Sequence, residues 1–151
     1  MRFRFRLDPV LGHRERLERE RAGEHAKALA VQLAAEQARD ELIGRRDAAR
    51  DRLLREHRTL DVIELRATYV HLEYVDRALV TAGQRITAAA AETERARQQL
   101  IAAARDRRVL ETLRDRRREA FDLDEALAVQ RETDDLNARA FERYSSEGIA
   151  P

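Results

Sequence analysis

Four histidines are the side chains in this 151-residue sequence that first suggest chemistry, because imidazole can bind a metal or transfer a proton. They are His13, His25, His57 and His71, separated by 12, 32 and 14 residues. Two imidazoles three or four residues apart can share a metal on one helix face, and no pair here has that spacing. The sequence has no cysteine, which excludes thiolate ligands and disulfides. We expect no metal site.

Carboxylates are abundant, with 29 Asp and Glu residues, but no catalytic arrangement accompanies them. The sequence contains no glycine-rich phosphate loop, no G-x-S-x-G motif and no H-E-x-x-H motif. Charged side chains outside a pocket do not acquire the shifted pKa values that acid–base catalysis needs. We therefore predict a protein that is not an enzyme, with no cofactor and no small-molecule substrate.

The composition favours long helices. Charged residues make up 39% of the chain but cancel to a net charge of +1, and the chain has 5 Gly and 2 Pro. Disordered chains usually combine high net charge with many helix-breaking residues, so this pattern argues against disorder. Because Pro9 and Pro151 stand at the two ends, helices can run without interruption between them. No apolar run is long enough for a signal peptide or a membrane span, and we expect a cytoplasmic protein.

Periodicity and capping signals predict two helices joined by a short turn. The first helix is expected at about 9–57 after Asp8-Pro9, the turn at about 57–61, the second helix at about 61–144 and a frayed tail at 145–151. Thr59 or Asp61 can cap the second helix, and Asp61 and Glu64 have the spacing of a capping box. We predict an all-α fold, an antiparallel two-helix coiled-coil hairpin whose second helix is longer, forming a single elongated domain.

Heptad spacing defines the expected seam of this hairpin. In the second helix one seam position is assigned to Leu65, Leu72, Leu79, Ile86 and Leu100. The partner position is assigned to Tyr69, Ala90 and Ala104. The first helix has a thinner seam that includes Leu17, Ala22, Ala26, Leu29 and Leu33 and continues, after a phase shift, at Ala38 and Leu42. Apolar residues on the unmatched length of the longer helix are expected to need an external partner.

Charge and aromatic residues suggest surfaces for binding. Residues 105–118 hold seven Arg against three acids, whereas residues 119–135 hold seven acids against Arg131. This reversal of charge could be read by a partner, or the two stretches could simply form a solvated face. Elsewhere Arg and acids alternate, which cancels the long-range electric field that phosphate binding needs, so we expect no nucleic-acid partner. The alternating segment Arg2–Leu7 is either a small docking arm or a disordered end. The aromatic patch at residues 69–79 either packs on the first helix or faces a partner.

Several segments, taken in order, resemble the FliJ family of the flagellar type III export apparatus. Residues 3–15 are similar to the family's opening F-x-F-x-L-x-x-[VL]-L-x-x-R-E. Residues 65–79 are placed like its L-x-N-Y-Q-x-[YF]-[IL]-x-x-L-x-x-A-[IL] segment just after the turn. Residues 104–114 are similar to A-R-x-x-[KR]-x-L-E-x-L-[KR], and residues 130–135 resemble Q-K-x-x-D-E. The resemblance covers nearly the whole chain.

The resemblance implies a coiled coil similar to the central stalk of rotary F-type ATPases, acting in flagellar assembly and motility. It implies three partners: the hexameric export ATPase, the export gate membrane protein and the export chaperones. It also implies peripheral association with the inner-membrane export apparatus. By position, the gate-contacting residues would be His71, Val75, Ala78 and Leu79.

Geometry adds an expectation about the ATPase. The two chain ends of an antiparallel stalk should meet, which would place one group of residues at the tip that enters the ATPase pore: Phe3, Phe5, Leu7, Val10, Phe141 and Tyr144. Two alternatives stay open, namely the equivalent stalk of a virulence-type III secretion injectisome and a generic coiled-coil scaffold or nucleic-acid-binding helix.

Overall fold

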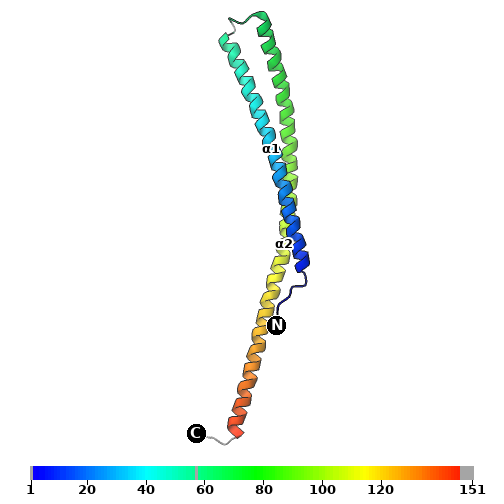
Figure 1. Cartoon of the computed structure of the whole chain (residues 1–151), viewed down its shortest axis with the longest axis vertical. Coiled ribbons are helices and arrows are strands. Elements are labelled where there is room, and N and C mark those ends of the chain that lie inside the picture. The colour runs from blue at the N-terminus through cyan, green and yellow to red at the C-terminus, as the bar shows by residue number, and fades with distance from the viewer. Residues whose placement is uncertain (1, 57, 147–151) are drawn as a thin grey trace. The chain divides into compact units, whose positions relative to one another are not determined.

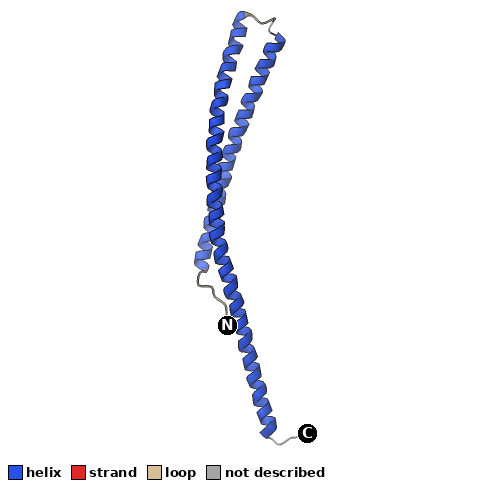
Figure 2. Ribbon diagram, turned by 180° about the vertical axis from the view of Figure 1, so that it is seen from behind, coloured by secondary structure: helices blue, strands red, loops and turns tan. Residues whose placement is uncertain are grey.

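A computed structural model describes residues 2–56 and 58–146, together with the side chains of these residues up to Arg143. In this part of the chain all regular structure is helical: α1 spans Asp8–Glu56 and α2 spans Val62–Ser146 (Figure 2). The two helices pack against each other as a hairpin, with α2 the longer (Figure 1). The predicted all-α helical hairpin is therefore confirmed. His57 and residues 147–151, most of the expected frayed tail, lie outside the described residues.

The turn between the helices is built by capping interactions, without Gly or Pro. At the end of α1, the Thr59 and Leu60 N–H groups donate to the Glu56 carbonyl at 2.8 and 3.0 Å. At the start of α2, the Asp61 carboxylate accepts from the Glu64 N–H at 2.7 Å, and the Glu64 carboxylate accepts from the Asp61 N–H at 3.3 Å. This reciprocal pair is the predicted capping box, and Asp61 rather than Thr59 caps α2.

The contacts of the chain divide it into two compact units. We call residues Arg16–Ala104 the hairpin unit and residues Met1–Glu15 with Arg105–Pro151 the terminal unit. Each contains part of α1 and part of α2, and each is described by itself below. The single elongated domain expected from the sequence stays a prediction.

In the hairpin unit, α2 presents a regular seam of alternating three- and four-residue steps. The first seam position is as predicted, since Leu65, Leu72, Leu79, Ile86 and Leu100 are all half-buried. The second seam position was predicted one residue too late. Its buried members are Val75, Ala82, Ala96 and Ala103, whereas Tyr69 is 60% exposed. Small alanines on this line let the two helices approach closely, and a one-residue change in register carries Tyr69 to the outside.

The inward face of α1 is more polar than the sequence suggested. Leu29 and Leu33, placed in the seam by their apolar character, are exposed, as are Ala22 and Ala26. The half-buried line at heptad spacing instead comprises Arg21, His25, Ala28, Gln32, Ala35, Arg39, Leu42, Arg46, Ala49 and Leu53. Arginine and glutamine can occupy such positions because their aliphatic stems cover the small alanines opposite while their polar ends reach water. Arg21, for example, donates from Nη1 to Gln99 Oε1 on α2 at 3.1 Å.

Candidate partner-binding surfaces

The four residues expected to contact the export gate have different environments in the hairpin unit. Val75 is 1% exposed and belongs to the packing between α1 and α2. Ala78 and Leu79 are half-buried, and His71 is exposed. A partner could therefore touch His71 directly, whereas Val75 can act on a partner only through the packing it supports while the hairpin stays closed.

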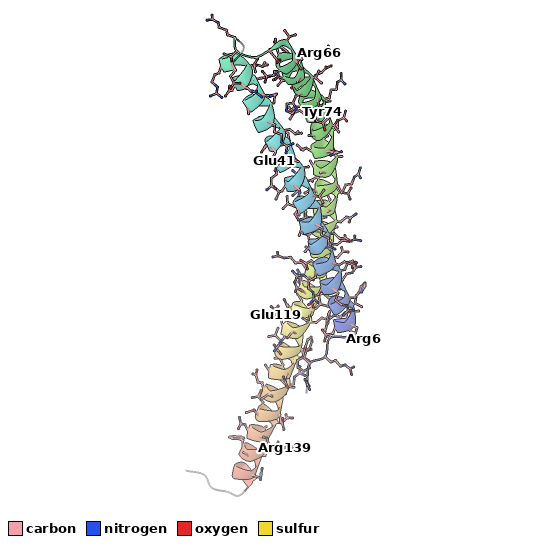
Figure 3. The ribbon with its side chains drawn as sticks, turned by 45° about the horizontal axis from the view of Figure 1, so that its top comes forward. Arg6, Glu41, Arg66, Tyr74, Glu119 and Arg139 are labelled. Atoms are coloured by element: carbon pink, nitrogen blue, oxygen red, sulfur yellow. The ribbon has the colours of Figure 1, made fainter. Side chains whose placement is uncertain are left out.

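His71 and Ala78 line two different grooves. Ala78 lies in a groove of about 780 Å³ that also receives Tyr74 from α2 and Ala34, Ala38 and Leu42 from α1. The Tyr74 side chain is exposed, and Figure 3 marks its place on α2. The α1 side of this groove was missed by sequence reasoning. Ala38 and Leu42 were seen as seam residues, and no signal in the sequence showed that their edge stays open.

The groove that contains His71 is more polar. It has a volume of about 510 Å³ and is lined by Arg45, Arg52, Glu64 and Thr68 as well as by small alanines. The two arginines form ion pairs with acids of α1: Arg45 lies 3.9 Å from Glu41, and Arg52 donates to Glu56 at 3.0 Å. This groove can offer polar contacts to a partner, in contrast to the apolar groove beside Ala78.

A third groove lies next to the turn and is strongly apolar. Its volume is about 570 Å³, and its lining is Arg50, Leu53, Leu54, Leu65, Tyr69 and Leu72. Tyr69 lies in this groove rather than in the seam. Of the two interpretations of that patch, packing on α1 holds for Val75, while Tyr69 and Tyr74 remain open to a partner.

In the terminal unit, the segment Arg2–Leu7 packs against α2. The Phe5 side chain is 4% exposed, and Leu11 in the first turns of α1 is 3% exposed. The Phe3 and Phe121 ring centroids lie 5.6 Å apart with an angle of 54° between the ring planes, a tilted contact within the range of favourable aromatic pairs. In the same unit, an ion pair of 2.9 Å between Arg14 Nη1 and Asp106 Oδ2 joins the first turns of α1 to α2. We call residues 2–7 the N-terminal arm.

The chain ends do not meet as the sequence geometry suggested. Phe3 contacts Phe121, and the 20 residues between Phe121 and Phe141 correspond to about 30 Å of helix. The expectation that Phe3, Phe5, Leu7 and Val10 lie near Phe141 is therefore wrong. Its cause is the length of α2, which has 85 residues against 49 in α1. The side chain of Tyr144 lies outside the described part of the chain.

Beyond the arm, α2 is exposed on every side. We call residues 122–143 the distal segment, and all of its described side chains are exposed within the terminal unit. Phe141 is 74% exposed, and the other large apolar side chains that face solvent are Leu123, Leu127, Val129 and Leu136. No other described segment of the terminal unit covers these side chains.

Most ion pairs join residues of the same helix. Examples are Glu73 with Arg77, Glu92 with Arg95 and Glu94 with Arg97, at steps of three or four residues. Hydrogen bonds from Arg97, and next from Gln98, lower the pKa of Glu94 from 4.5 to about 2. Because these groups are exposed, such pairs contribute little to stability. They fit solvated helix faces better than catalytic groups.

Neither a metal-binding cluster nor a membrane-spanning helix is found in the described residues. Among residues 2–56 and 58–146, no group of three or more His, Asp or Glu side chains is arranged to hold a metal ion. Within the same ranges, neither helix includes a stretch apolar enough over the length required to cross a membrane.

Comparison with known proteins gives one match. The family model described as the flagellar FliJ protein matches residues 3–146, which include the N-terminal arm, both helices and the distal segment. No curated protein and no solved structure matches the chain.

Proposed function

This chain belongs to the FliJ family of flagellar proteins, which has an export-related role, and we propose that it serves as a stalk in flagellar type III protein export. In this proposal the chain binds the export ATPase hexamer, the export gate and the export chaperones, and so aids flagellar assembly and motility. The single observation that carries the proposal is the family match over residues 3–146. The same match favours the flagellar system over a virulence injectisome.

The exposed distal segment supports an ATPase contact. Its apolar side chains, with Phe141 the most exposed, have no cover within the described part of the terminal unit. The pore of a ring-shaped partner could surround a single helix and cover all of these faces together. Because Phe3 contacts Phe121 of α2 and Phe5 is buried, the N-terminal arm would support the base of this helix, and Phe141 and Tyr144 would lead into the pore.

The hairpin unit would carry the gate contact. We place it at the groove beside Ala78, with Leu42 and Tyr74 at its edges and His71 in the neighbouring groove. Val75 and Leu79 would hold the two helices at the spacing that forms these grooves. Binding of this kind needs complementary shape and exposed apolar and aromatic side chains, which the two grooves supply.

The work done by such a protein is mechanical and regulatory. Its family is associated with export and is not a known enzyme family. ATP hydrolysis would take place on the ATPase, while this chain would change the rate by binding the hexamer. Contacts with the membrane-embedded gate would keep it at the cytoplasmic side of the inner membrane.

A binding experiment tests the proposal. Purified export ATPase and the cytoplasmic domain of the export gate are each passed over the immobilised chain. We expect both to be retained. Leu136→Glu combined with Phe141→Glu should remove ATPase binding and leave gate binding unchanged. Val31→Glu is the matched control, because Val31 is also exposed but lies on α1 in the hairpin unit. Equal ATPase retention by all three proteins would contradict the proposed pore contact.

A further inference from the structure

The terminal unit contains a reversal of charge on one continuous helix. Arg116, Arg117 and Arg118 precede residue 119, and the acids Asp122, Asp124, Glu132, Asp134 and Asp135 follow it. Figure 3 marks Glu119, where the sign changes. Within the described part of the terminal unit, none of the side chains just named forms an ion pair. Elsewhere on α2, Arg77, Arg95 and Arg97 pair with acids of their own helix.

Apolar residues pass through the same point at heptad spacing. Leu113, Ala120 and Leu127 recur every seven residues and so share one face of α2. This face differs from the one under the N-terminal arm, because Ala120 is offset by about 100° around the helix from its neighbour Phe121, which contacts the arm. Ala120 and Leu127 are exposed, and Leu113 is half-buried.

We propose that a second copy of this chain pairs with this face, antiparallel, with a two-fold axis beside Ala120. In such a pair, residues equally distant from Ala120 on its two sides face each other. Leu113 then meets Leu127 of the other copy, and Arg116 meets Asp124. The two-fold axis makes every one of these contacts twice, as in any isologous dimer.

Charge complementarity selects this occupant. One α2 presents a basic stretch and an acidic stretch side by side, so an antiparallel copy brings Arg116 of each chain to Asp124 of the other on this face. A parallel copy would place like charges together. An anionic surface would be attracted by residues 116–118 and repelled by residues 122–135. The dimer goes beyond the proposed export function because it needs no other protein, and since it covers Leu127 it is an alternative to the pore-bound chain.

A disulfide test can locate the axis, since the natural sequence has no cysteine. Residues on a two-fold axis face their own copies, so Ala120→Cys should form a covalent dimer with oxidised glutathione. Ala140→Cys is the matched control, because it is also an exposed alanine of the distal segment but lies 20 residues from the axis. We expect a dimer band from Ala120→Cys and none from Ala140→Cys. Equal yields from the two variants would overturn the proposed register.

Charge exchange tests the pairing itself, by sedimentation velocity at low salt. One variant carries Arg116→Glu, and a second carries Asp124→Arg. Each alone places like charges together and should self-associate about tenfold more weakly than the natural chain, or not at all. An equimolar mixture should restore the dimer, because both contacts between positions 116 and 124 are then opposite in sign.

Controls keep the outcome interpretable. Circular dichroism should show equal helix content in both variants and the natural chain. High salt should weaken the natural dimer, since the Debye length falls from about 10 Å at 0.1 M to about 3 Å at 1 M. A natural chain that stays monomeric at low salt would overturn the proposal. Binding of a basic peptide to the acidic stretch of that monomer would not restore it. A mixture that fails to associate would overturn it as well.

Discussion

Val75 shows how much a single side chain decides in this protein. It is the most buried residue of the hairpin unit, and its line of the seam otherwise consists mainly of alanines. Since α1 faces that line with many polar side chains, few residues supply large apolar contacts. The family resemblance placed Val75 on a partner-contacting face. In the structure this side chain is buried in the packing between α1 and α2.

Val75→Asp should destabilise the hairpin unit strongly. The substitution places a charge without a partner in the packed interior, which costs about 3 kcal/mol or more of unfolding free energy. Val70→Asp is the matched control, because Val70 is exposed on the same helix and should change stability by less than about 0.5 kcal/mol. Urea unfolding followed by circular dichroism measures both. Similar midpoints for the two variants would show that Val75 is not in the interior.

Glu94 gives the molecule an identifiable pH response. Hydrogen bonds from Arg97 and Gln98 lower its pKa from 4.5 to about 2. A lowered pKa in the folded state means that the stabilising contribution is fully present above pH 4.5 and is lost as the pH falls toward 2. Arg97→Ala should raise the pKa toward its ordinary value, as followed by NMR of the Glu94 carboxyl carbon. An unchanged pKa in this variant would remove Arg97 as the cause.

At the scale of elements, the sequence predicted those features that depend on residues close together in the chain. The positions of both helices follow from the lack of breakers between Pro9 and Pro151, and the turn follows from the Asp61 and Glu64 capping box. The register of the seam was harder to predict, because two heptad assignments one residue apart both contain apolar residues. Packing of small alanines under long polar side chains favoured the assignment that buries Val75.

The N-terminal arm is the element whose state the sequence left open. Its anchor Phe5 is 4% exposed, so Phe5→Ala should cost about 3 kcal/mol locally through lost burial and a cavity. We expect faster hydrogen exchange in residues 105–121 and unchanged exchange in the hairpin unit. Phe141→Ala is the matched control, because Phe141 is exposed and its truncation should leave exchange in residues 105–121 unchanged. Equal protection of residues 105–121 in all three proteins would show that the arm is not anchored by Phe5.

At the scale of the whole molecule, family membership could be predicted and the surfaces only in part. Ordered motifs over nearly the full chain indicated the family, and the match to residues 3–146 confirms it. The binding residues depended on which apolar side chains the hairpin leaves uncovered, and this is set by packing between segments distant in sequence. The α1 edge of the groove beside Ala78 and the contact of Phe3 with Phe121 were therefore missed.

The central claim, that this chain acts on the export ATPase by binding it, is tested most directly by the rate of ATP hydrolysis. Purified flagellar export ATPase is assayed alone, with the natural chain, and with the variant carrying Leu136→Glu and Phe141→Glu. The account predicts that the natural chain raises the rate and that the variant, with its helix content intact, does not. A rate that stays the same at saturating concentrations of the natural chain would contradict it.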